Sequence, residues 1–132
     1  MALHIYGPRF SSLVRSVRLY CLEMGLEASV GLSVAGRPVA LHSPEHLALH
    51  PFGQVPVLLH DGASVFETLA ICRYLDRAFP AHSLEPEDAA GRLLVEQWAS
   101  ALISTVDTRL IRRYLLPVAG PGNAAPLDSA AL

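Results

Sequence analysis

The sequence predicts an α/β domain built on a mixed four-stranded sheet, followed by a helical segment. Two patterns predict the domain: short β-rich runs alternate with apolar residues at helical spacing, and an Asp-Gly pair separates two later apolar runs. A third pattern predicts the segment, because beyond residue 87 apolar residues recur at helical spacing. Alternating strands and helices are typical of α/β layers.

The residues at the element ends support this order. Gly25 falls where a helix C-cap is expected, and Asp61-Gly62 is typical of a two-residue hairpin turn. One apolar helix face is formed by Leu69, Ile71, Tyr74, Leu75 and Phe79. The predicted elements are a strand at 2–6, a helix at 12–25, a strand at 28–34, a short helix near 44–49, strands at 56–60 and 63–66, and a helix at 67–79. A βαβ unit followed by ββα is the order of a thioredoxin-like domain, here at residues 1–80, with a right-handed crossover.

A polar linker at 81–86 separates this domain from a second part at 87–132. The apolar stripe of that part consists of Leu94, Val95, Trp98, Leu102, Val106 and Leu110. We expect Trp98 to lie in a core rather than against a ligand. Beyond Pro117 the density of Pro and Gly residues predicts an irregular end.

Composition excludes several classes of partner. The formal net charge of the 132 residues is −2, which favours neither nucleic acid nor an anionic membrane. Apolar runs are interrupted well before the ~20 residues of a membrane-spanning helix, and no signal peptide is evident. We therefore expect a cytoplasmic protein. Cys21 and Cys72 are too few for a disulfide framework or a zinc site, and we expect both to be buried thiols.

Three histidines recur at a spacing of four residues: His42, His46 and His50. On a continuous helix such a spacing lines up metal ligands. Pro44 and Pro51 leave room for less than two turns, and no carboxylate set accompanies the histidines. We expect a solvated helix face and no metal.

Residues 50–75 hold the strongest candidate site. Their order of turn, strand, turn, strand and helix brings Val55 beside Glu67 and Thr68 at one end of the sheet. A helix N-terminus favours a carboxylate, so this edge suits a short peptide with a free carboxylate. Thr68 could alternatively serve only as an N-cap. Pro56 suits the first residue of a strand, and spacing leaves the isomer of the Val55–Pro56 bond open.

The same stretch resembles the cytosolic glutathione S-transferase family, in particular its phi- and theta-type members with a serine at the start of the first helix. The matching motifs are Pro51-Phe52-Gly53-Gln54-Val55-Pro56, Asp61-Gly62, Glu67-Thr68-x-Ala70-Ile71-x-x-Tyr74-Leu75, Leu3-His4-Ile5-Tyr6-Gly7 and Ser11-x-x-x-Arg15-x-Val17. His50 stands where the family usually has asparagine, and His46 where it often has phenylalanine.

The resemblance implies roles for individual residues. Ser11, or Ser12 after a one-residue shift, would donate its hydroxyl proton to the glutathione sulfur, and Arg15 would support the first helix. The remaining implied glutathione contacts are Gln54, Val55 and Pro56 for the peptide backbone, Glu67 and Thr68 for the γ-glutamyl group, and His42 for the glycyl carboxylate.

The resemblance further implies a transferase that joins the glutathione thiolate to a small hydrophobic electrophile, acting as a homodimer. Phe52 would insert into the partner subunit, or alternatively pack on its own sheet. Family members continue into an all-helical domain, so this chain is expected to be truncated in that domain. Two alternatives remain: a glutathione-binding or scaffold protein without turnover, and a glutathione-dependent disulfide reductase.

Overall fold

The computed structural model describes residues 2–119. The chain divides into two compact units, Met1–Glu85 and Pro86–Leu132, and each is described here by itself. The predicted irregular end lies outside the described residues, apart from Val118 and Ala119, which belong to the last helix. None of the described helices is long and apolar enough to cross a membrane.

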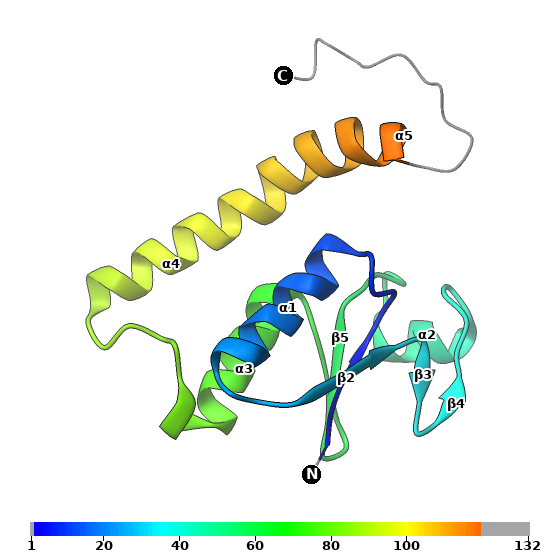
Figure 1. Cartoon of the computed structure of the whole chain (residues 1–132), viewed down its shortest axis with the longest axis horizontal. Coiled ribbons are helices and arrows are strands. Elements are labelled where there is room, and N and C mark those ends of the chain that lie inside the picture. The colour runs from blue at the N-terminus through cyan, green and yellow to red at the C-terminus, as the bar shows by residue number, and fades with distance from the viewer. Residues whose placement is uncertain (1, 120–132) are drawn as a thin grey trace. The chain divides into compact units, whose positions relative to one another are not determined.

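The first unit is the predicted thioredoxin-like α/β layer (Figure 1). Its elements are β1 (Leu3–Tyr6), α1 (Ser12–Glu23), β2 (Ala28–Gly31), β3 (Ser33–Val34), β4 (Arg37–Pro38), α2 (Pro44–Leu49), β5 (Val57–His60), β6 (Ala63–Phe66), α3 (Thr68–Ala78) and the 3₁₀ turn η1 (Pro80–His82). These bounds agree with the sequence prediction to within two residues, except at 28–34.

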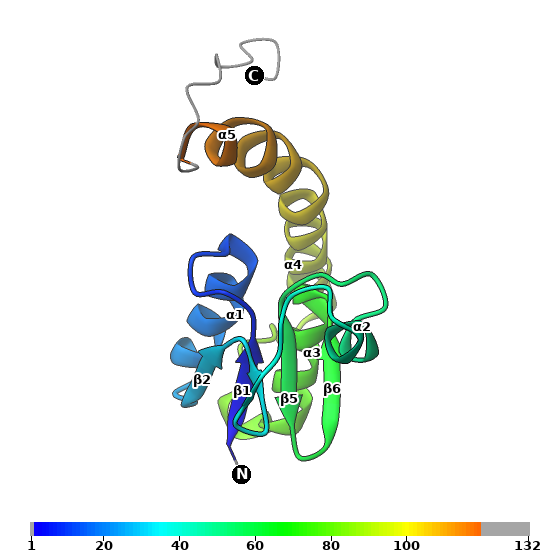
Figure 2. The same ribbon diagram turned by 90° about the vertical axis from the view of Figure 1, so that its right-hand side faces the viewer.

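The mixed four-stranded sheet has the strand order β2-β1-β5-β6, which Figure 2 shows side by side. β1 pairs parallel with β2 and antiparallel with β5, and β5 pairs antiparallel with β6. The register aligns Gly31, Tyr6, Val57 and Phe66 in one row across the sheet. This row lies where β1, β2 and β6 end and β5 begins.

The single strand predicted at 28–34 is wrong. β2 ends at Gly31, and β3 pairs instead with β4 in a separate hairpin whose register opposes Val34 to Arg37. Its two turn residues, Ala35 and Gly36, have φ of 48° and 77°. Two positive φ values are what a type I′ turn requires, and alanine in the first position hid that turn from the sequence pattern.

The main core lies where α1 and α3 pack side by side on one face of the sheet (Figures 1 and 2). Its fully enclosed residues are Leu3, Ile5, Val14, Val17, Cys21, Met24, Leu58, Ile71 and Leu75. A smaller cluster of Tyr6, Val39 and Val57 covers the opposite face. Neighbouring residues of β1 and β5 thus point to opposite faces, as pleated strands require.

The second unit begins with α4 (Ala89–Ala101), whose N-cap Asp88 accepts a 2.8 Å hydrogen bond from Gly91 N–H. The helix continues as the π-helical segment η2 (Leu102–Leu115) and as α5 (Leu116–Ala119). Trp98 is 60% exposed, so its predicted place in a core is wrong. Within the described part of this unit the chain forms one continuous helix, and no other helix there covers the stripe.

Candidate functional site

The row Gly31–Tyr6–Val57–Phe66 brings three loops to one edge of the sheet. Residues 7–11 leave β1 there, residues 54–56 enter β5, and residues 67–68 leave β6 for α3. Strand pairing therefore gathers the segments that carry Ser11, Val55 and Glu67.

Gly7 shows how closely two of these segments approach. A Cβ atom at this position would lie 2.5 Å from Val14 Cγ2 and 3.2 Å from Val55 Cβ, and the residue has φ of 152°. Only glycine fits such an approach, which packs the first turn of α1 against Val55. Ser11 is the N-cap of that turn.

Ser11 has extended backbone geometry, with φ of −61° and ψ of 129°. Its Oγ accepts a long 3.5 Å hydrogen bond from Val14 N–H. A hydroxyl that accepts in this way still has its own proton to donate, so capping and thiol binding are compatible. Ser12 is the first residue of the helix, and its carbonyl accepts a 3.1 Å hydrogen bond from the Ser16 hydroxyl.

The segment before β5 carries the residues expected to hold a peptide backbone. The Val55–Pro56 peptide bond is cis. Gln54 is exposed, Val55 is half-buried and Pro56 is buried. The chain thus presents one polar residue and one backbone segment at the sheet edge and anchors them with a buried proline.

The N-terminus of α3 differs from the capping alternative in the sequence analysis. Thr68 is the first helical residue, and Glu67 holds the N-cap position without a side-chain cap hydrogen bond. Thr68 as a simple N-cap is therefore wrong. Glu67 has φ of 70°, and its carboxylate is 57% exposed. A residue with a Cβ atom at such a φ is strained, and strain of this kind concentrates at functional sites.

The expected solvated histidine face is wrong for two of its three members. His46 is 0% exposed and His50 is 2% exposed, whereas His42 is exposed with φ of 63°. His46 Nδ1 accepts from His42 N–H at 2.9 Å, and its Nε2 lies 3.0 Å from the Gln54 carbonyl. The two rings are covered by the segment at 52–54 and by the rings of Tyr6 and Phe66 on the sheet, contacts that helical spacing alone cannot reveal.

His50 also contacts the site. Its Nδ1 accepts a 3.2 Å hydrogen bond from Phe52 N–H, and its Nε2 lies 3.8 Å from Glu67 Oε1. Burial lowers the pKa of His50 below its usual value; the Glu67 carboxylate opposes that shift and His46 adds to it. Sequence reasoning missed both buried histidines. The available signal was their i, i+4 spacing, which places them on one face of α2.

Phe52 is 74% exposed, so packing on its own sheet is wrong for this ring. Its ring makes an edge contact with His50, with centroids 6.1 Å apart. The dimer contact expected for Phe52 stays a prediction.

The cysteines lie away from this edge. Cys21 is buried as expected, whereas Cys72 is only partly buried. Burial raises the pKa of both thiols, that of Cys72 to about 12 with further contributions from Asp76 and Cys21. Neither supplies a thiolate near neutral pH. Among the described residues, no cluster of His, Cys, Asp and Glu side chains could hold a metal ion.

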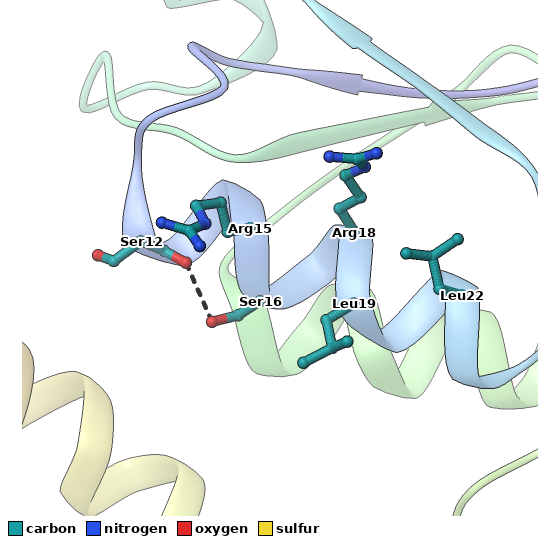
Figure 3. Close-up of a pocket in the computed structure, with 6 residues that line it drawn as sticks. All are labelled: Ser12, Arg15, Ser16, Arg18, Leu19 and Leu22. Atoms are coloured by element: carbon teal, nitrogen blue, oxygen red, sulfur yellow. Dashed lines mark hydrogen bonds between the residues drawn. The ribbon is translucent and has the colours of Figure 1, made fainter.

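A surface pocket of about 460 Å³ is lined by α1 alone, namely by Ser12, Arg15, Ser16, Arg18, Leu19 and Leu22 (Figure 3). Figure 3 shows the two arginines pointing to the same side of the helix and Leu19 to the opposite side. The pocket shares only Ser12 and Arg15 with the candidate site. Arg15 is exposed, and its supporting role stays a prediction.

Comparisons with known proteins identify the family. The family model "Glutathione S-transferase, N-terminal domain" matches residues 1–77. Glutathione S-transferase F10 of Arabidopsis thaliana is 30% identical over 133 aligned residues, which cover 97% of this chain and 60% of that protein. Protein LigF of Sphingobium sp. (strain NBRC 103272 / SYK-6) is 37% identical over 100 residues, covering 74% of this chain and 38% of that protein.

A solved structure is similar over nearly the whole chain. The theta class glutathione S-transferase from Xanthomonas axonopodis pv. citri, with glutathione bound, has a TM-score of 0.79 and 31% sequence identity. The match covers 98% of this chain and 61% of that one. The chain thus spans less than two thirds of each of these three proteins.

Proposed function

The chain belongs to the glutathione S-transferase family, and we propose that it binds glutathione and joins the glutathione sulfur to a small hydrophobic electrophile. One observation supports this most directly: strand pairing gathers the N-cap of α1, the Val55 segment and the N-terminus of α3 at one sheet edge. A relative with the same fold is described with glutathione bound.

In this proposal Ser11 stabilises the thiolate. A free thiol has a pKa near 8.5, so only a few per cent of glutathione is ionised at pH 7. A hydrogen bond to a charged group contributes about 1.5–3 kcal/mol. At about 1.4 kcal/mol per pKa unit, the Ser11 hydroxyl lowers the thiol pKa by about one to two units. The N-terminus of α1 adds positive potential in the same direction.

The two ends of glutathione would be held by different segments. The Glu67 carboxylate pairs with the γ-glutamyl ammonium group, while the N–H groups and Thr68 hydroxyl at the start of α3 hold the adjacent carboxylate. The backbone of Gln54 and Val55, braced by Pro56, pairs with the peptide groups of glutathione. His42 meets the glycyl carboxylate.

The transfer step needs only glutathione and the electrophile. The thiol proton passes to solvent as the thiolate forms. Its sulfur then attacks an electrophilic carbon, a C–S bond forms, and the leaving group departs with the bonding electron pair. No enzyme cysteine takes part, since the pKa values of Cys21 and Cys72 are raised.

A second candidate is glutathione binding without turnover. It needs only the site residues of the first unit, all of which the structure describes. Both candidates need the same glutathione site, and conjugation separates them. We further propose a cytoplasmic homodimer with Phe52 at the contact. The Phe52 ring is exposed and therefore accessible to a partner subunit.

Replacing Ser11 tests the proposal. We expect Ser11→Ala to lower kcat/KM for an activated aryl chloride by about tenfold to a hundredfold, because one charge-assisted hydrogen bond is lost. Ser12→Ala tests the alternative donor and should change kcat/KM less than threefold. The far-ultraviolet absorbance of bound thiolate gives the thiol pKa directly. Equal losses in both variants, or an unchanged thiol pKa in Ser11→Ala, would contradict the role of Ser11.

A further inference from the structure

Helix α2 and its C-cap carry two buried imidazole rings four residues apart, His46 in the helix and His50 at the cap. A buried polar ring is costly unless its nitrogen atoms are paired. Each ring contacts segments outside its own helix, and these contacts determine where its proton lies.

His46 bridges two segments of the proposed glutathione site. Its Nδ1 faces the backbone N–H of His42 at 2.9 Å, and its Nε2 faces the Gln54 carbonyl at 3.0 Å. A backbone N–H can only donate and a carbonyl can only accept. In this arrangement Nδ1 of His46 accepts, and the ring proton lies on Nε2. The Tyr6 ring packs against it, with centroids 4.9 Å apart.

His50 repeats the arrangement one turn later. Its Nδ1 faces the N–H of Phe52 at 3.2 Å, so the proton again belongs on Nε2. That nitrogen points toward Glu67 Oε1, 3.8 Å away. The Phe66 ring, just before Glu67, packs on the imidazole with centroids 4.6 Å apart. His50 thus links the loop at 52–54 to the N-terminus of α3.

We propose that His46 and His50 are positioning residues that hold His42, the loop at 52–54 and Glu67 in register for glutathione. His42, Gln54 and Glu67 come from three separate segments, and each is exposed. Ligand-binding groups must be held to within about 0.5 Å by packing and hydrogen bonds. The two rings supply such contacts to all three segments, and the role rests on the proposed glutathione binding.

A protonated His50 ring cannot perform this role. In an imidazolium both nitrogens donate, so Nδ1 would face the N–H donor of Phe52. A charged His50 would also compete with the ammonium group of glutathione for Glu67. His42 and Tyr6 are the titratable groups that face the His46 ring. Glu67 faces the His50 ring, and His46 and His50 also lie near each other. Glutathione affinity should therefore fall as the pH is lowered from 7.5 to 5.5.

The test compares variants that keep or remove these hydrogen bonds. His50→Asn can still accept from Phe52 N–H, whereas His50→Ala cannot; His46→Phe fills the site but makes neither bond. His60→Asn is the matched control, because His60 lies on β5 and its Nδ1 contacts the Tyr74 hydroxyl instead, at 2.9 Å. Calorimetry with glutathione at pH 7.5 should show about tenfold weaker binding for His50→Ala and His46→Phe. His50→Asn should recover to within threefold, and His60→Asn should match the unaltered chain.

Two further readouts separate positioning from folding. Nitrogen-15 NMR of the unaltered chain should show the Nε2–H tautomer for both rings at pH 7.5. The pH dependence of affinity should be smaller in His50→Asn than in the unaltered chain, because the pKa of His50 lies below its usual value. If His46→Phe loses its cooperative unfolding transition, the His50→Ala and His50→Asn pair decides the outcome.

Affinities within twofold of the unaltered chain in both His50→Ala and His46→Phe would overturn the positioning role and leave the glutathione assignment standing. An Nδ1–H tautomer at either ring would overturn it as well. If the unaltered chain binds no glutathione, the proposed function fails together with the glutathione part of this role. The anchoring of the loop is then supported by the Nε2–H tautomer and overturned by its absence.

Discussion

At the scale of single residues, the site depends on side chains whose local geometry is unusual. Ser11 caps α1 through a long hydrogen bond, and Glu67 enters α3 at a positive φ. The sequence motifs named both residues as candidates. Only the structure distinguishes their local roles, because the sequence offered Thr68 as the N-cap of α3, whereas Glu67 holds that position.

Glu67 combines a charge with a strained backbone, and two substitutions separate these properties. Both Glu67→Ala and Glu67→Gly remove the carboxylate, so we expect each to weaken glutathione binding by about fivefold to tenfold. Glycine adopts a φ of 70° without strain, whereas alanine does not. The glycine variant should therefore have the higher free energy of unfolding, by about 1 kcal/mol. Equal unfolding free energies, measured in urea, would contradict the assignment of strain to Glu67.

His50 makes stability depend on pH with a definite sign. Its pKa in the folded chain lies below the unfolded value near 6.5. The unfolded state consequently binds the proton more readily, and the free energy of unfolding falls as the pH drops from 6.5 toward the folded pKa. The stabilisation is complete above about pH 7.5. Urea unfolding at pH 7.5 and 5.5 should show a smaller loss for His50→Asn than for the unaltered chain; equal losses would contradict the assignment.

At the scale of elements, the predictable parts are those with strong local signals. The helix at 44–49 and the strand at 63–66 match in both bounds, since Pro44 starts the helix and Asp61-Gly62 sets the turn. The β3–β4 hairpin was not predicted, because alanine occupies a turn position that usually holds asparagine, aspartate or glycine. The buried face of α2 was not predicted either, because the loop that covers it is a tertiary feature.

The end of α3 is fixed by Asp76, a carboxylate that is 4% exposed. It accepts hydrogen bonds from the Tyr20 hydroxyl at 2.8 Å, the Ser83 hydroxyl at 3.0 Å and Leu84 N–H at 3.0 Å. Burial and this carboxylate together raise the pKa of Tyr20 well above its usual range. Asp76 therefore joins α1, α3 and the segment after η1.

Replacing this carboxylate should destabilise the first unit. We expect Asp76→Asn to lower the free energy of unfolding by about 1–3 kcal/mol, because the amide nitrogen cannot accept a hydrogen bond from its donors. Tyr20→Phe removes one donor and should cost about 1 kcal/mol. The double variant should lose less free energy of unfolding than the two single variants together, because the two residues share a hydrogen bond. Strict additivity in urea unfolding would contradict the network.

At the scale of the whole molecule, the first unit has its own core and the complete set of glutathione candidates. The second unit presents an apolar stripe whose members are exposed, among them Leu94, Trp98 and Leu102. Periodicity predicted the stripe correctly, whereas the exposure of Trp98 was not predictable from it. A stripe shows which residues can be buried, and only packing partners decide whether they are.

The family and the thioredoxin-like fold could be predicted from the sequence because several motifs fall at fixed offsets between Leu3 and Leu75. The electrophile could not be predicted, since no motif of the second part points to a substrate. The central claim therefore concerns the thiol donor: one glutathione molecule binds at the sheet edge formed by Ser11, Val55 and Glu67.

Amide NMR of the 132-residue chain titrated with glutathione tests this claim most directly. We predict saturable shifts at a single site, largest for Ser11, Val55, Glu67 and Thr68, with little change along α4. Shifts confined to α4 or to the β3–β4 hairpin would contradict the claim, as would the absence of any saturable shift.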